Sequence, residues 1–198
     1  MPSILRTLSD LLSPDAVQAL SWRIGTDERS TERVLATALP VLLVALARHV
    51  ANESGAASLL AALERDHDGG ILDDPLAALR GTPCRSGETI LAQVLGARRN
   101  PVELEIGRQT AVDPAFASRT LAALAPLVLG AVGRERRRHG WGALALRRAL
   151  GTECTYAEDV LPGSVGVFEE LLEAEADREM GEDVPDVGEE LRRRLSRV

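Results

Sequence analysis

Apolar residues fall along the chain in segments with the three- or four-residue spacing of a helix, and the alternation typical of strands is essentially absent. Caps and breakers separate these segments. Ser13-Pro14, Asn100-Pro101 and Asp113-Pro114 each predict an N-cap followed by proline in the first turn, and Gly25, Gly96 and Gly151 predict helix ends. We therefore predict helices over residues 3–12, 14–24, 27–52, 56–65, 75–80, 87–95, 101–109, 114–138, 141–150, 164–180 and 187–197.

Two of these segments resemble each other. "RVLATALPVLLVALAR" (Arg33 to Arg48) and "RTLAALAPLVLGAVGR" (Arg119 to Arg134) lie 86 residues apart and share seven of sixteen positions. The match includes Pro40 and Pro126. A proline inside a helix removes a hydrogen bond and costs about 3 kcal/mol. We therefore predict an internal duplication whose two central helices are kinked at proline and buried on nearly every side.

Composition agrees with a helical core. The chain has 198 residues, of which 45% are hydrophobic but only 3% aromatic, so Leu, Val and Ala must fill the interior. Ala and Leu favour helices, and the aromatic residues that suit strands are scarce. The prediction is an all-α fold, a compact array of short crossing helices, with a duplicated domain over residues 1–152. Residues 153–198 are predicted to form an acidic helical extension, because residues 169–190 hold eleven of the thirty acids.

Three segments resemble a known family. The loop "DHDG" after a Leu-rich helix, "ILAQVLG" (Ile90 to Gly96) and "LAPLVLGAVG" (Leu124 to Gly133) are similar to the YidB-like bacterial family, a domain-of-unknown-function family. The resemblance covers about residues 10–150. It implies an all-helical fold and no particular activity. The chain departs from the family where Glu64 stands at the place of an Asp.

The stretch "ERDHDGGILDD" resembles a calcium-binding loop. With Gly69 at loop position 6, Glu64, Asp66 and Asp68 take positions 1, 3 and 5, and the Gly70 carbonyl takes position 7. Position 12 is Pro75 instead of the expected Glu, which leaves Asp73 or Asp74 as a substitute. The alternative interpretation is a turn built on Asp and Gly, followed by Asp74 as the N-cap of a helix.

The segment Gly133 to Leu150 is a basic cluster. Its arginines are Arg134, Arg136, Arg137, Arg138, Arg147 and Arg148. They could bind nucleic acid, although a net charge of -7 and few aromatic residues argue against general affinity for phosphates or bases. The alternative is a solvated helix end, with its positive charge near the helix C-terminus and paired with the acidic tail.

No catalytic motif stands out. His49, His67 and His139 lie far apart without a nucleophile motif beside them, and Cys84 and Cys154 lack a metal-binding spacing. The apolar stretch Val34 to Ala47 is too short to span a bilayer. We therefore expect a non-enzymatic cytoplasmic interaction or assembly protein, without a membrane span. Its partner would be another protein or a second copy, and calcium would be the one candidate cofactor.

Overall fold

Helices connected by short loops make up the computed structural model, which describes residues 3–81, 85–161 and 164–173; no strand occurs in these ranges. The α-helices are α1 (Ile4–Leu11), α2 (Pro14–Ile24), α3 (Glu28–His49), α4 (Glu53–Arg65), α5 (Pro75–Arg80), α6 (Arg85–Leu95), α7 (Arg99–Thr110), α8 (Pro114–His139), α9 (Ala143–Val160) and α10 (Ser164–Glu173). Two short 3-10 helices, η1 (Gly70–Asp73) and η2 (Gly96–Arg98), join α4 to α5 and α6 to α7. The predicted all-α fold is confirmed.

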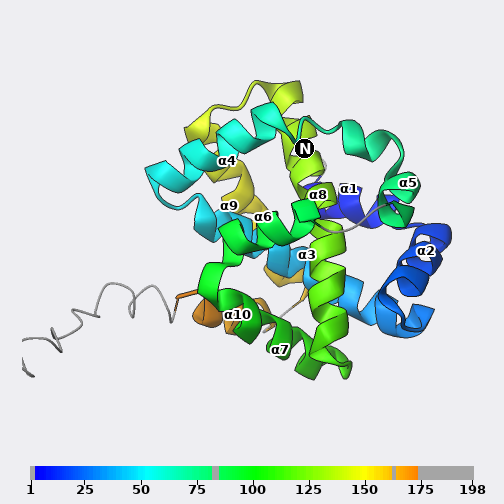
Figure 1. Ribbon diagram of the computed structural model, residues 1–198. Helices are drawn as coiled ribbons and strands as arrows, with labels where there is room; N and C mark the ends of the chain where they lie inside the picture. Colours follow the sequence, from blue (N-terminus) through cyan, green and yellow to red (C-terminus); the bar gives the residue numbers. More distant parts are fainter. Residues whose placement is uncertain (1–2, 82–84, 162–163, 174–198) are drawn as a thin grey trace, which may run out of the picture.

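The helices α3 and α8 form the centre of the fold. Figure 1 shows α8 running through the middle of the molecule, with α4 and α9 on one side and α2 and α5 on the other. Most residues of both helices are buried, as the apolar sequence on every side of them predicted. Pro40 and Pro126 lie inside these helices, and the helical assignment continues through each. The predicted kinks and the duplication stay predictions.

By length and composition alone, α3 and α8 could each cross a membrane. The apolar stretch Val34 to Ala47 covers only part of α3, whereas the whole helix has 22 residues. In both helices 72% of the apolar window is buried inside the fold. The core helices of soluble proteins can be equally long and apolar, and the absence of a membrane span stays a prediction.

Side-chain caps define several helix starts as predicted. The hydroxyl of Ser13 accepts from the Ala16 N–H at 3.3 Å, and the Asp113 carboxylate accepts from the Ala115 N–H at 2.8 Å. The predicted Asn100 cap is wrong, because α7 begins at Arg99 directly after η2. Arg99 fixes that start through ion pairs with Glu88 and Glu103, which also raise its pKa.

The predicted helix end at Gly151 is also wrong. The helix α9 continues from Ala143 to Val160, because Glu153 and Ala157 are buried beyond the glycine. Tertiary packing here outweighs the low helix propensity of Gly. The boundary predicted between residues 152 and 153 therefore falls inside one continuous helix.

Residues on both sides of that boundary share one core. A single cluster of buried apolar side chains extends from Ile4 to Leu172 and includes Phe168 of α10. Arg48 of α3 holds α10 through Glu169 at 3.4 Å and Glu173 at 2.5 Å. The predicted helix over 187–197, and the part of the 164–180 prediction beyond Glu173, lie outside the described residues.

Candidate functional site

The acidic loop between α4 and α5 is built by turns and caps. Gly69 has a φ of 101°, a conformation that favours glycine, and it starts η1. The Asp68 carboxylate accepts a hydrogen bond from the Gly70 N–H at 3.0 Å. Asp74 accepts from the Ala77 N–H at 2.8 Å and so caps α5, whose first residue is Pro75. The turn-and-cap interpretation describes this backbone.

The loop rests directly on α8. A side chain at Gly133 would place its Cβ 1.8 Å from the carbonyl oxygen of His67, and one at Gly69 would lie 2.7 Å from the Cβ of Arg134. Both glycines are therefore needed for the close approach of two backbones. This contact brings the acidic loop against the basic end of α8.

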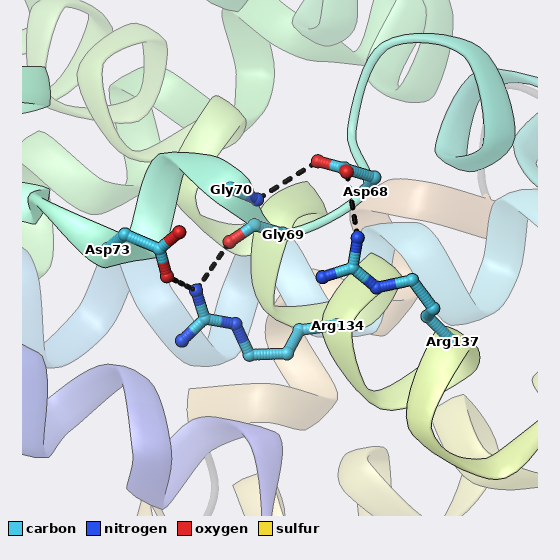
Figure 2. A network of polar contacts seen from close by, with 6 residues as sticks. All are labelled: Asp68, Gly69, Gly70, Asp73, Arg134 and Arg137. Atoms are coloured by element: carbon cyan, nitrogen blue, oxygen red, sulfur yellow. Dashed lines mark hydrogen bonds and ion pairs between the residues drawn. The ribbon is translucent and has the colours of Figure 1, made fainter.

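Arginines of the basic cluster bind the carboxylates of the loop. Figure 2 shows Arg134 donating to the Gly69 carbonyl, at 2.6 Å, and to Asp73. Arg137 donates to Asp68 at 2.8 Å. Arg136 pairs with Glu64 at the end of α4. Two sets of candidate site residues that the sequence suggested separately are thus partners of each other.

The remaining arginines of the basic cluster differ in their hydrogen-bond and ion-pair partners. Arg138 pairs with Glu135 of its own helix at 2.9 Å, and Arg147 donates to the Ala51 carbonyl at 2.5 Å. Arg148 is exposed, and its guanidinium has no hydrogen bond or ion pair to the described part of the chain. Since arginines bound to acids offer less charge to a phosphate backbone, this arrangement does not favour nucleic-acid binding, which stays a prediction.

The carboxylates of the calcium hypothesis each have a protein partner. Glu64, Asp68 and Asp73 bind arginines of α8; Asp66 pairs with Arg65 at 2.7 Å, and Asp74 caps α5. Across the described ranges, no three Asp, Glu, His or Cys side chains gather as a metal ion requires. Calcium would have to displace several arginines, and its binding stays a prediction.

The electrostatics of the loop agree with these contacts. The pKa of the Asp68 carboxyl lies below its ordinary value, chiefly because the Gly70 N–H donates to it and then because Arg137 lies near. Burial lowers the pKa of His67, an effect that the charge of Asp66 partly opposes. Both shifts favour a charged Asp68 carboxylate and a neutral His67 imidazole at neutral pH.

A cavity of about 520 Å³ opens beside the loop. His67 and Asp68 lie on its wall, together with Ile90 of α6 and Leu129 of α8. All three segments that carry the family resemblance thus contribute to one cavity. His49 also lines it, and burial lowers the pKa of its imidazole. His139 lies elsewhere, 3.3 Å from Glu135 and stacked on Trp141.

Sequence reasoning missed a groove along α9. Its wall follows Trp141, Ala145, Ala149, Thr152, Tyr156 and Val160, and we call this surface the α9 groove. The residues on α9 recur three or four positions apart and so form one stripe. The exposed side chain of Arg6 in α1 lines the opposite side. The small residues Ala and Thr in this stripe gave no clear apolar signal in the sequence.

Glu153 fixes the position of α1 next to this groove. Its carboxylate accepts from the hydroxyl of Ser3 at 2.7 Å and from the amide N–H groups of Ile4 at 2.8 Å and Leu5 at 3.1 Å. A carboxylate at a helix N-terminus also interacts favourably with the helix dipole. One buried acid thereby holds α1 to α9.

Comparison with known protein families gives a match to part of the chain. The family model for bacterial proteins of unknown function, DUF937, matches residues 6–135, which extend from α1 to near the end of α8. No curated protein and no solved structure gave a significant match. Both α9 and α10 lie beyond the matched residues, although they pack into the same core. With about two thirds of its length covered by the family model, the chain belongs to the DUF937 family.

Proposed function

We propose that the protein is a non-enzymatic assembly protein that pairs with a second copy of itself through the α9 groove. The observation that carries this proposal is the apolar stripe on α9. Tyr156 and Val160, one turn apart on that stripe, are 37% and 49% exposed. Leu144, at the start of α9, is 60% exposed and lines the groove next to Ala145. Exposed apolar side chains that lie together are typical of protein interaction surfaces.

The charges on α9 support a second copy as the partner. Arg148 lies in the first half of the helix and Asp159 near its end; both are exposed and both flank the stripe on the same side. When two copies of α9 pair antiparallel, Arg148 of one copy faces Asp159 of the other. A twofold contact of this kind uses the same patch on both copies, so it is closed and self-complementary.

The shape of the stripe suits the same arrangement. Ala145, Ala149 and Thr152 lie between the larger side chains of Leu144 and Tyr156 along the helix. Small residues at the middle allow two helix backbones to approach closely, and the larger ones pack at the ends of the contact.

The thiol of Cys154 is held in its unreactive form. The thiolate is the reactive form of cysteine. Burial raises the pKa of the Cys154 thiol to about 11, helped by the negative charge of Glu169. This thiol is therefore protonated at neutral pH.

The test is the oligomeric state of the full chain by size-exclusion chromatography with light scattering over a range of concentrations. We expect a dimer that Tyr156→Arg converts to a monomer. The matched control is Leu104→Arg on α7, since Leu104 is also a large exposed apolar residue, at 51%, but lies outside the groove. A monomeric wild type at the highest concentration, or a Tyr156→Arg variant as dimeric as wild type, would overturn the proposal.

A further inference from the structure

A cleft separate from the α9 groove runs between α4 and α6. It consists of the cavity of about 520 Å³ beside the acidic loop and a second cavity of about 580 Å³ at the end of α3. His49, Gln93 and Val94 line both cavities, so the two adjoin each other. Gln93 also donates a hydrogen bond to Ser58 of α4 at 2.8 Å, which ties the two walls together.

Among the charged residues that line this cleft, one cation has no ion-pair partner. Among described residues, Arg98 is the one charged side chain lining either cavity that has no hydrogen bond or ion pair. Arg48 is bound by Glu169 and Glu173, Arg65 by Asp66, and Asp68 by Arg137. An unpaired guanidinium in a concave site is a natural partner for a carboxylate or another anion.

Two residues that line the second cavity each carry a buried nitrogen without a partner. The Nε atom of Arg98 and the Nε2 atom of His49 are both buried and have no hydrogen-bond partner. Leaving such groups unpaired costs free energy, so binding of a ligand that hydrogen-bonds to these side chains would be favourable. Since burial lowers the pKa of His49, its imidazole adds no second charge.

The other end of the cleft is mainly apolar. Leu59, Ile71, Ile90 and Leu129 line the cavity beside the loop. Its charged residues are already paired with each other or with α8. A pocket that is apolar at one end and holds one unpaired cation at the other suits a molecule with the complementary polarity.

We propose that this cleft binds an amphipathic molecule with a single negative charge, of the class of medium-chain carboxylates. The head group lies at Arg98 in the second cavity. The alkyl chain passes His49 and Gln93 and occupies the apolar cavity beside the acidic loop.

Calorimetric titration of the full chain with decanoate tests the proposal. We expect saturable binding of one decanoate per chain, and weaker binding of decyltrimethylammonium, which has the same chain and the opposite charge. Arg98→Gln should weaken decanoate binding roughly tenfold or more, as expected for loss of a charge-assisted hydrogen bond. Binding of decanol should change little in this variant.

Two further variants test whether decanoate binds in this cleft: one blocks the cleft, and the other removes a distant charge. Gln93 is exposed, so Gln93→Trp should fill the junction of the cavities without disturbing the core, and binding of both decanoate and decanol should be lost. Arg29→Gln is the control, because Arg29 is exposed at the opposite end of α3 from His49. Absence of saturable decanoate binding, or wild-type affinity in Arg98→Gln, would overturn the proposal.

Discussion

The backbone of Gly87 in α6 lies directly against the carbonyl oxygen of Ala122 in α8. A Cβ atom at Gly87 would stand only 1.8 Å from that oxygen. In a regular helix the Ala122 carbonyl would accept from the N–H of residue 126, but Pro126 has none. The proline thus leaves a carbonyl without its helical partner at the point where a glycine brings α6 close.

Gly87→Ala should therefore destabilise the fold, by about 1–3 kcal/mol or more, because one of the two helices must move apart. The free energy of unfolding in denaturant measures this loss. Gly151→Ala is the matched control. Gly151 lies inside α9, and a methyl group added there would meet nothing within 4 Å, so the change should stabilise by about 0.5–1 kcal/mol. Equal stability of the two variants would contradict the close contact of α6 and α8.

Glu153→Ala should remove the acceptor for the first amide groups of α1. Leaving the Ile4 and Leu5 N–H groups unpaired at a buried site is expected to cost about 1–3 kcal/mol. Glu153→Gln keeps one acceptor oxygen and should lose less. The control is Glu158→Ala on the same helix, which is exposed and should change stability by at most about 0.5 kcal/mol. If both alanine variants unfold alike, Glu153 does not hold α1.

Arg137→Gln should raise the pKa of Asp68 without restoring it fully, because the Gly70 N–H still donates to the carboxylate. An NMR titration of the side-chain carboxyl carbon measures the change. Since the folded-state pKa is lowered, the stabilising effect of this carboxylate is present above its ordinary pKa and is lost as pH falls through the folded value. Arg65→Gln, which leaves Arg137 in place, is the control; an unchanged Asp68 pKa in Arg137→Gln would contradict the contact.

Cys154 should react slowly with alkylating reagents. With a pKa of about 11, its thiolate population near neutral pH is roughly two orders of magnitude below that of an ordinary cysteine. The rate is best measured in a Cys84→Ser background, so that Cys154 is the one thiol present, and compared with the same chain in denaturant. The native rate should rise steeply up to about pH 11. A native rate equal to the denatured rate at about pH 8 would show that burial does not protect the thiol.

The acidic loop gives a test of the calcium hypothesis. Because Arg134, Arg136 and Arg137 already bind the loop, we expect the melting temperature to be the same in calcium and in chelator. A calcium-dependent increase that disappears when Asp66 and Asp68 are both replaced by Asn would instead establish the loop as a calcium site.

Local sequence signals predicted most of the helices because caps act within a few residues. Ser13 and Asp113, for example, hydrogen-bond to amides only two or three positions away. Gly151 misled the prediction because the packing of α9, a tertiary effect, decides whether the helix continues. The sequence alone had no means to weigh that packing against the propensity of glycine.

The candidate site was only half predictable for a similar reason. The acidic loop and the basic cluster were each evident as runs of like charge. Their pairing was not, because Glu64 and Arg136 are 72 positions apart and meet only when Gly133 lets the loop approach α8. The two clusters have opposite charge and similar size, and this was the one signal in the sequence that could have predicted their contact. Arg98 was missed because the sequence does not show which of the charged side chains around it are paired with each other.

The contact of Glu153 with α1 has a consequence for synthesis of the chain. Ser3 and Glu153 are 150 positions apart, so α1 emerges from the ribosome long before its acceptor is made. At cellular elongation rates this delay is on the order of ten seconds. During that time the first turn of α1 lacks its native partner. Native closure of the N-terminal helix therefore occurs late in synthesis, and it requires that α9 has emerged from the ribosome.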